Sequence, residues 1–420
     1  MSDTIKQKIN KYLISETDFL KYKDKMTEEQ MRSFIDQVVV EVCNEQKIKL
    51  SKDEQALLIK NLVSDNISLG PLRTLMQDET VTEIMINGHK KIYVQRFGRI
   101  ELTNIAFETE QSLNHTIQKI LHASGTNKRV DESSPFVDFS LNDGSRVNVI
   151  IPPLSQIGPV VTIRKFRDDI KDADDLVNLK ELNEEIAALI VAGMKARLNI
   201  VFCGSTGAGK TTALNVFSKY IPSDERIVTI EDTPELRLKQ GHVVSLTSRP
   251  ANLEGKGEIT MRELFVNSLR MRPDRIIVGE IRGGEMLDLI ESITSGHSGS
   301  LAIVHAETTQ DCFSRMVTMT LMTGIPLSTE EIQKQVSSAI DMIIHIELFM
   351  DGVRRVTCVT DIHYNEKTAK VELNNIFEFK QESVSDSGAV IGDWVKSKRK
   401  PSFYHKFEKR RVSLPDGYFD

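Results

Sequence analysis

The sequence predicts an α/β protein of two or three domains, whose C-terminal domain is a parallel sheet covered by helices. At 420 residues, the chain exceeds the size at which a single hydrophobic core stops growing. In its second half, apolar strand-like runs alternate with helical segments, which is typical of a parallel sheet with helices on its faces. Near the middle of the chain, an apolar run leads into a glycine-rich loop and then into a helix.

An N-terminal helical lobe is expected over residues 1–68. Apolar residues between Met31 and Val42 recur at the spacing of an amphipathic helix. Ser51 and Glu54 fit a capping box at the start of a second helix. This segment therefore predicts a small helical piece without strands.

A small mixed α/β domain is expected over residues 69–167, because short strand-like runs are separated by turn signals such as Asn87-Gly88 and Asp143-Gly144. The expected strands cover residues 83–86, 92–95, 146–151 and 160–163. The following stretch is rich in aspartate and lacks periodicity, so residues 168–180 are expected to be an exposed linker.

The C-terminal domain is expected over residues 181–420. Residues 185–197 predict a helix, and Asp351-Gly352 predicts a tight hairpin turn. The expected strands cover residues 200–203, 226–230, 243–246, 275–278, 301–304, 342–349 and 353–360.

The composition excludes several classes of protein. The four cysteines, Cys43, Cys203, Cys312 and Cys358, lie far apart and form no C-x-x-C pair. This argues against a disulfide framework, a zinc ribbon or a secreted protein. No uninterrupted apolar run approaches the roughly 18 residues that span a bilayer, and the N-terminus has no apolar signal core. We therefore expect a soluble, cytoplasmic protein.

The net charge of −6 hides a basic C-terminal segment. Residues 396–411 carry eight Lys or Arg against one acid, Glu408, so the rest of the chain is strongly acidic and does not predict nucleic-acid binding. Phe403, Tyr404 and Phe407 interrupt the basic segment. It could contact anionic lipid or an acidic partner, although a terminal segment packed on its own domain is the commoner outcome.

The segment NIVFCGSTGAGKTT, residues 199–212, predicts a phosphate-binding loop. Gly204-x-x-x-x-Gly209-Lys210-Thr211 fits the pattern in which backbone N–H groups converge on the phosphates of a nucleotide. The predicted nucleotide-binding residues are Gly204, Ser205, Thr206, Gly207, Ala208, Gly209, Lys210, Thr211 and Thr212. In this pattern, Lys210 supplies a positive charge and Thr211 a ligand for Mg²⁺.

Two carboxylate clusters follow this loop at predicted strand ends. Glu231 and Asp232 follow the strand at 226–230, and Glu280 follows an apolar strand and Gly279. Glu280 fits the position of a residue that aligns or deprotonates an attacking water, and Glu231 that of a residue that assists the metal or the water. The alternatives are a surface acid for Glu280 and a helix cap for Glu231.

Two histidines, His297 and His305, flank the expected strand at 301–304. A zinc site is disfavoured because no third convergent ligand is evident. At a strand end next to Glu280, His305 could hydrogen-bond a γ-phosphate or a catalytic carboxylate.

The order of these motifs resembles one family, the secretion and pilus traffic ATPases, over residues 69–349. The family's Walker A, Asp box, Walker B and His box match the phosphate loop, I-E-D-T-P-E-L, R-P-D-R-I-I-V-G-E-I-R-G-G-E and G-H-S-G-S-L-A-I-V-H-A. The resemblance implies a RecA-like P-loop ATPase domain preceded by a small PAS-like α/β domain and a helical lobe. It also implies ATP and Mg²⁺ as cofactors, and a ring, usually a homo-hexamer.

Finer motifs are similar to the tight-adherence (Tad) pilus ATPases of the CpaF or TadA type. They include L-G-P-L, V-T-E-I-M-I-N-G, D-E-S-S-P, D-G-S-R-V-N and T-I-R-K-F in the first half, and K-P-S-F near the end. This resemblance implies a cytoplasmic motor for pilus assembly or retraction, at the cytoplasmic face of the membrane, with a polytopic inner-membrane platform protein as partner. Peripheral membrane association would come through that partner or the basic segment.

In the family, arginines of the N-terminal domain close over the nucleotide, and the matching residues here are Arg146 and Arg164. Guanidinium groups suit this role because they stabilise charge spread over a transferred phosphoryl group. The alternative is that both are ordinary surface arginines. Arg270, Arg272 and Arg282 around Walker B are interpreted as structural or intersubunit residues.

Three other functions remain as alternatives. A RecA-like nucleic-acid motor is disfavoured by the acidic body and by the lack of a basic and aromatic track outside the C-terminal segment. A non-hydrolysing ring subunit is disfavoured by the presence of Lys210, Thr211 and Glu280 together. A GTPase is disfavoured because no N-K-x-D motif follows the phosphate loop.

Overall fold

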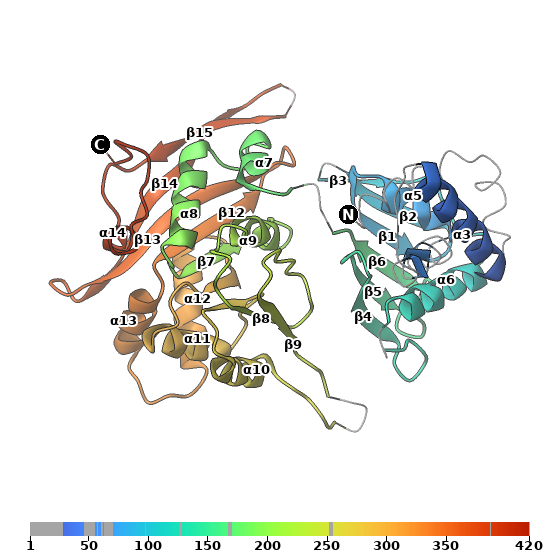
Figure 1. Ribbon diagram of the computed structural model, residues 1–420, viewed down its shortest axis with the longest axis horizontal. Coiled ribbons are helices and arrows are strands. Elements are labelled where there is room, and N and C mark those ends of the chain that lie inside the picture. Colours follow the sequence, from blue (N-terminus) through green and yellow to red (C-terminus); the bar gives the residue numbers. More distant parts are fainter. Residues whose placement is uncertain are drawn as a thin grey trace. The chain divides into compact units, whose positions relative to one another are not determined.

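The computed structural model describes residues 28–45, 55–56, 58–59, 62, 70–96, 98–125, 128–166, 170–251, 255–386 and 388–419. The chain divides into two compact units, Met1–Phe166 and Arg167–Asp420 (Figure 1). The capping box expected at Ser51 and Glu54 lies outside the described residues.

The N-terminal unit contains an antiparallel six-stranded sheet with the order β3-β2-β1-β6-β5-β4. Its strands are β1 (Val81–Asn87), β2 (Lys91–Arg96), β3 (Arg99–Leu102), β4 (Phe136–Ser140), β5 (Arg146–Ile150) and β6 (Val160–Arg164). The helices that the structure bounds in this unit are α3 (Glu28–Glu45), the 3-10 turn η2 (Gly70–Leu72), α5 (Arg73–Gln77) and α6 (Glu110–Ala123). Strands β3 and β4 had no counterpart among the expected strands.

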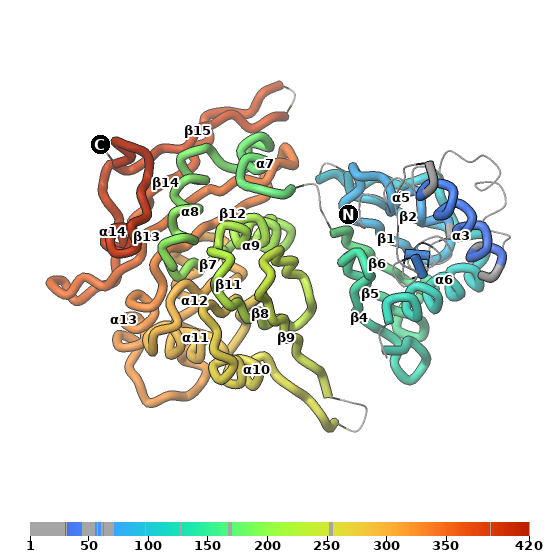
Figure 2. The backbone as a smooth tube through the Cα atoms, in the orientation of Figure 1, coloured from blue at the N-terminus to red at the C-terminus, as the bar shows by residue number. Residues whose placement is uncertain are grey.

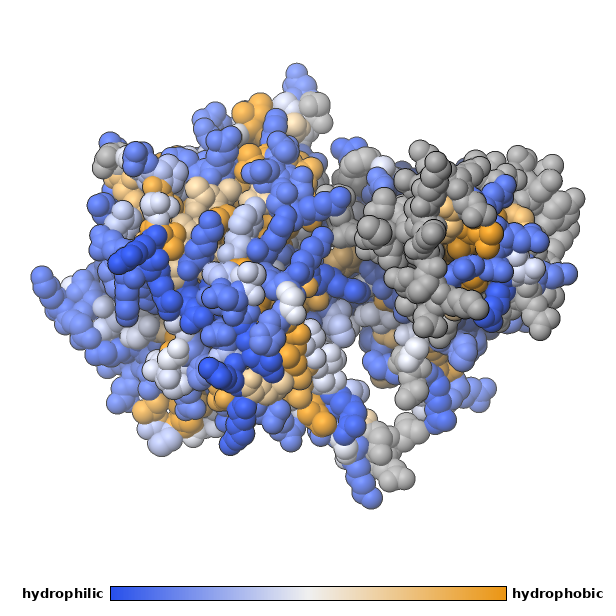
Figure 3. All heavy atoms as spheres, viewed as in Figure 1, coloured by the Kyte–Doolittle hydropathy of each residue, from blue (hydrophilic) through white to orange (hydrophobic). Residues whose placement is uncertain are grey.

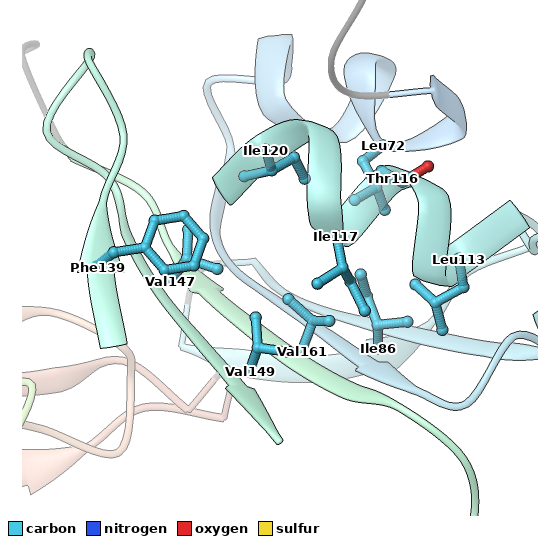
Figure 4. Close-up of a pocket in the computed structure, with 10 residues that line it drawn as sticks. All are labelled: Leu72, Ile86, Leu113, Thr116, Ile117, Ile120, Phe139, Val147, Val149 and Val161. Carbon is cyan, nitrogen blue, oxygen red and sulfur yellow. The ribbon is translucent and has the colours of Figure 1, made fainter. Parts of the chain in front are cut away.

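Helix α6 supplies one side of the core of this unit. Thr109 caps it by accepting a hydrogen bond from the N–H of Ser112. Its apolar residues Leu113 and Ile117 face alternate residues of the sheet, and a cavity of about 10 Å³ remains between them (Figure 4). Space of this size holds about one water. The side chains of α6 and of the sheet therefore fill almost all of the volume between them.

The C-terminal unit is built on a nine-stranded sheet with the order β15-β14-β13-β12-β7-β11-β10-β8-β9. The strands from β12 to β9 are parallel, and β12 to β15 form an antiparallel extension. The strands are β7 (Ile200–Gly204), β8 (Ile227–Glu231), β9 (Val243–Thr247), β10 (Arg275–Val278), β11 (Leu301–His305), β12 (Met342–Leu348), β13 (Arg354–Asn365), β14 (Lys370–Val384) and β15 (Val390–Lys396).

Helices cover both faces of the parallel part. The helices described in the C-terminal unit are α7 (Ala173–Asn178), α8 (Glu184–Lys195), α9 (Lys210–Ser218), α10 (Met261–Ser268), the 3-10 turn η3 (Leu269–Met271), α11 (Glu285–Thr294), α12 (Thr309–Leu321), α13 (Thr329–Ala339) and α14 (Tyr404–Arg410). Alternate residues of β7 enter different cores. Ile200 and Phe202 pack with α8 and α9, whereas Val201 and Cys203 pack with α10 to α13. The mixed α/β fold predicted from the sequence is confirmed.

The segment expected to be a linker contains helix α7. Asp172 caps this helix by accepting from the N–H of Asp175, and the Asp175 carboxylate accepts in return from the N–H of Asp172. Ala173 and Leu176 are buried against the C-terminal unit. The clustered aspartates therefore begin a helix rather than keep the chain extended.

The basic C-terminal segment packs on its own unit, beside the antiparallel extension (Figure 2). Phe403 and Phe407 are buried in the core, and the Lys406 Nζ lies 2.7 Å from Oδ1 of buried Asp341. The exposed basic residues that remain are Lys398, Arg399, Lys400, Lys409, Arg410 and Arg411. The aromatic residues of the segment thus pack in or against the core of the C-terminal unit. This agrees with the alternative in which the terminal segment packs on its own domain.

In the described part of the chain, no helix combines the length and apolarity needed to span a bilayer. The face of the C-terminal unit visible in Figure 3 is mostly hydrophilic.

Candidate nucleotide-binding site

The predicted site residues of the C-terminal unit gather where four neighbouring parallel strands end. Strands β7, β11, β10 and β8 lie side by side in this order. Because parallel strands end at the same edge of a sheet, their last residues are brought together. Gly204 and His305 are the last residues of β7 and β11 and are paired in register, and Glu231 is the last residue of β8. Such an edge is where open α/β sheets bind ligands.

The loop after β7 depends on glycine at two places. A side chain at Gly204, which has φ 149°, would meet the carbonyl oxygen of Ile346 at 2.1 Å. Gly209 has φ 97° and precedes α9, which has no side-chain cap. The first N–H groups of α9 are therefore available to an anion, and the helix dipole favours negative charge there.

Lys210 is buried, with 6% of its surface exposed, and its ammonium lies against this loop. The Nζ donates to the carbonyls of Gly204 (3.0 Å) and Ser205 (2.7 Å) and lies 3.4 Å from Nδ1 of His305. An ammonium has only donors, so Nδ1 of His305 must accept. The proton of a neutral His305 is therefore on Nε2.

This Nε2 lies 2.9 Å from Oε1 of Glu280, to which it donates. Burial, and then the charge of Lys210, lower the pKa of His305, while Glu280 acts in the opposite direction. The neutral form is therefore favoured at pH 7. The other carboxylate oxygen of Glu280, Oε2, accepts from Nη2 of Arg282 at 2.5 Å. The structure thus links Lys210, His305, Glu280 and Arg282 in one chain of polar contacts.

Gly279 lets the ends of β8 and β10 approach each other. A Cβ at this position would lie 2.8 Å from Cγ of Glu231. Glu231 itself is buried, and its Oε1 accepts from the backbone N–H groups of Glu235 and Leu236, both at 2.8 Å. Its carboxylate therefore holds the turn that follows β8. Asp232 accepts a hydrogen bond from Ser248 at the edge of the site.

The turn held by Glu231 carries a carboxylate, that of Glu235, that is not among the predicted site residues. Oε2 of Glu235 accepts a hydrogen bond from the Thr211 hydroxyl at 3.2 Å. In the sequence, Glu235 is the second glutamate of the I-E-D-T-P-E-L segment, four residues after Glu231. Glu235 is thus the acid in contact with the predicted metal ligand Thr211.

A second residue outside the predicted set is Arg354, at the start of β13. Its Nε donates to the carbonyl of Gly207 at 3.0 Å. The two residues are 147 positions apart, and no motif of the loop indicates such a partner. Only the fold of the hairpin after Asp351-Gly352 brings Arg354 to the loop.

His297 does not join His305. It precedes β11, so it lies at the opposite edge of the sheet, and its Nδ1 is 3.3 Å from the carbonyl of Ser292.

Arg146 and Arg164 belong to the N-terminal unit and lie directly opposite each other on β5 and β6. Arg164 also lies opposite Glu83 of β1, with 3.8 Å between its Nε and Oε1 of the glutamate. The two predicted arginines are therefore cross-strand neighbours in the sheet of the N-terminal unit.

The family model of the "Type II/IV secretion system protein" matches residues 65–374 of the chain. The conjugal transfer protein TrbB of Rhizobium radiobacter is 32% identical over 317 residues, which cover 73% of this chain and 93% of that protein. The type IV secretion system protein VirB11 of Brucella suis is 30% identical over 350 residues, covering 76% of this chain and 94% of that protein. The X-ray structure of the Yersinia pseudotuberculosis ATPase DotB superposes with a TM-score of 0.50 at 17% identity, covering 76% of this chain and 82% of that one, and shows a shared fold.

Proposed function

The chain belongs to the type II/IV secretion system protein family, and we propose that it hydrolyses ATP with Mg²⁺ to power a membrane-bound secretion or pilus machine. The observation that carries the proposal is the contact chain from Lys210 through His305 to Glu280. It joins a group that neutralises phosphate charge to a carboxylate that can act on water, within one site.

Each residue has a role in this proposal. The loop from Gly204 to Thr212 holds the phosphates, and Lys210 neutralises charge on the β- and γ-phosphates. Glu280 aligns or deprotonates the attacking water, and neutral His305 senses the γ-phosphate. Such positioning and electrostatic stabilisation supply most of the catalysis in phosphoryl transfer.

The donors near Thr211 fit a magnesium ion. The Thr211 hydroxyl and the Glu235 carboxylate are oxygen donors in contact with each other, and Mg²⁺ prefers oxygen ligands. Glu231 assists by fixing the turn that carries Glu235. When bound, Mg²⁺ would neutralise the charge of the phosphates.

Arg146 and Arg164 would supply further positive charge during hydrolysis. Guanidinium groups delivered by a second domain stabilise the transferred phosphoryl group and couple turnover to domain motion. The two arginines are cross-strand neighbours on β5 and β6, and this supports a joint role.

The machine is proposed to be a tight-adherence pilus or related system. The motifs L-G-P-L, V-T-E-I-M-I-N-G and K-P-S-F support this branch. The names of the relatives, a conjugal transfer protein and a type IV secretion protein, support the wider class. We propose a homo-hexamer that binds a polytopic inner-membrane platform protein from the cytoplasmic side.

The experiment compares phosphate release by the parent chain and by Glu280→Gln at saturating ATP and Mg²⁺. The variant is expected to bind ATP as the parent does and to lose at least about 100-fold in turnover, because the amide cannot take a proton from water. Glu291→Gln, on the exposed side of α11, is the matched control. Unchanged turnover in Glu280→Gln would remove Glu280 from its role.

The nucleic-acid motor makes a different prediction. Single-stranded DNA would stimulate its ATP hydrolysis several-fold, whereas a secretion motor is expected to be indifferent to DNA. Strong stimulation would contradict the proposed function.

A further inference from the structure

We propose that Arg354 is a positioning residue that holds the phosphate-binding loop in its binding conformation and thereby sets the affinity for nucleotide. The inference rests on the proposed function in that it takes the loop from Gly204 to Thr212 as the nucleotide site. It goes further because it assigns part of that site to a strand outside the parallel sheet.

The Arg354 side chain lies along the glycines of the loop. Its Nε donates to the Gly207 carbonyl at 3.0 Å, and its Cδ lies 2.8 Å from the position that a Cβ of Gly209 would occupy. Gly209 therefore has a second reason to be glycine besides its φ of 97°. The Arg354 side chain therefore contacts the loop at two residues, by a hydrogen bond at Gly207 and by close packing at Gly209.

The peptide group that Arg354 contacts is also held at its other end. The N–H of Ala208, in the same peptide plane as the Gly207 carbonyl, donates to the carbonyl of Ser205 at 3.3 Å. Lys210 holds the first part of the loop through the carbonyls of Gly204 and Ser205. Two cations thus fix the carbonyls of successive parts of the loop, and N–H groups of the loop and of α9 remain for phosphate.

Arg354 lies on a hairpin that is held in place by contacts of the next residue, Arg355. Its neighbour Arg355 is buried and forms two hydrogen bonds, of 3.0 and 2.8 Å, with the carboxylate of Asp351. These bonds are the largest cause that lowers the pKa of Asp351 to about 2. The guanidinium of Arg355 also lies 4.9 Å from the ring centroid of Phe349. Because neighbouring residues of a strand point to opposite faces, anchoring Arg355 on one face directs Arg354 to the other.

A preformed loop binds its ligand more tightly because less conformational entropy is lost on binding. The guanidinium also adds positive charge beside the phosphate site, and a hydrogen bond from a charged group is stronger than one between neutral groups. Both effects act on the ground state and the transition state alike. Loss of Arg354 should therefore raise KM more than it lowers kcat.

The test uses the full chain with Arg354→Met and Arg354→Lys, and Arg399→Met as the control. The Met variant keeps an apolar stem over Gly209 and loses every donor, whereas the Lys variant keeps a donor and a charge. Arg399 is exposed, lies in the same unit and contacts Asn374, so its replacement makes the same change in charge. ADP and ATP affinities are measured by calorimetric titration, and steady-state phosphate release gives KM and kcat.

We expect Arg354→Met to weaken both ADP and ATP roughly tenfold or more, as for loss of a hydrogen bond from a charged group. KM for ATP should rise to a similar extent with kcat within about twofold, and Arg354→Lys should recover part of the affinity. Amide exchange of the peptide that covers residues 203–210, measured without nucleotide, should be faster in the Met variant and unchanged in the control.

Three results would overturn the inference. The first is an ADP affinity of Arg354→Met within about twofold of that of the parent. The second is a loss of affinity in this variant that is confined to ATP. The third applies where the Met variant does not fold, and is an ADP affinity of Arg354→Lys equal to that of the parent. A parent chain that binds ADP but does not hydrolyse ATP contradicts the proposed function alone, since the ADP comparison still decides the role of Arg354. A parent chain that binds neither nucleotide contradicts both.

Discussion

His305 lies between an ammonium and a carboxylate, and its protonation state decides which contacts it can make. In the neutral form, Nδ1 accepts from Lys210 and Nε2 donates to Glu280. Protonation would place a second donor against the Lys210 ammonium and break this arrangement. Burial and Lys210 together lower the pKa of His305 below its ordinary value of about 6.5.

The sign of the pH effect follows from this direction. The neutral form of His305 is favoured at neutral pH and is lost as the pH falls through the lowered pKa. We therefore expect kcat of the parent to fall on the acid side, at pH values lower than the ordinary pKa of histidine would give. In His305→Gln this acidic limb should disappear while a lower, flatter rate remains. Stopped assays across pH 5 to 8 check this, and an identical pH profile in both proteins would exclude His305 as the titrating group.

Glu235 gives a second prediction at the residue scale. Its carboxylate contacts the Thr211 hydroxyl, and the turn that carries it is fixed by Glu231. Glu235→Gln removes one negative charge from the proposed magnesium site but keeps the shape of the side chain. We expect the Mg²⁺ concentration for half-maximal hydrolysis to rise several-fold while ADP binding without metal is unchanged. Glu258→Gln, at an exposed position, is the control, and an equal Mg²⁺ requirement in both variants would place the ion elsewhere.

At the scale of elements, a buried ion cluster joins the starts of β8 and β10. Arg275 is fully buried and pairs with Glu225, and it also donates to the carbonyls of Met194 and Gly299. Glu225 accepts in addition from Arg197. The cluster lies at the edge of the sheet opposite to the nucleotide site, so its effect is expected on stability rather than on chemistry.

Removing one partner of this cluster leaves a buried charge without its counter-ion. Glu225→Gln is expected to lower the free energy of unfolding by about 3–5 kcal/mol. The double variant Glu225→Gln with Arg275→Met should regain part of this loss, because the buried charge is gone. Trp394, the single tryptophan of the chain, lies on β15 and reports unfolding of the C-terminal unit in urea. A double variant less stable than Glu225→Gln would contradict the explanation.

The sequence predicted the elements that follow simple patterns. Strands β7, β8, β10 and β11 are buried on both faces, so apolar residues dominate each of them and they can be recognised without knowledge of the fold. Strands β14 and β15 mix charged and apolar residues and have many exposed positions, so no run marked them. Helix α7 was missed because its capping aspartates have the composition of a linker.

The site shows the same division between local and long-range information. The residues of the phosphate loop and Glu280 follow strand ends within short motifs, and the sequence is sufficient to select them. The contact of Arg354 with Gly207 depends on hairpin geometry, and that of Glu235 with Thr211 depends on the turn held by Glu231. Such contacts arise only when distant segments fold together, so the sequence pattern did not indicate them.

At the scale of the whole molecule, the proposed motor requires both units, because Arg146 and Arg164 are on one and the phosphate loop is on the other. Arg164 can leave its present partner at small cost. Its ion pair with Glu83 has an N···O distance of 3.8 Å, and both side chains are about one-third or more exposed. Pairs of this kind contribute little to stability, about 0–1 kcal/mol.

We therefore expect the double variant Arg146→Ala with Arg164→Ala to lower kcat at least about tenfold, since arginines that stabilise a transferred phosphoryl group have large effects on turnover. ADP affinity should stay within about twofold of the parent, because the phosphate loop and Arg354 are intact. The double variant Arg99→Ala with Arg129→Ala, at two exposed arginines of the same unit, is the control for the change in charge. A parent-like kcat in the double variant would mean that the C-terminal unit hydrolyses ATP without these arginines, and that turnover is coupled to the N-terminal unit through other residues.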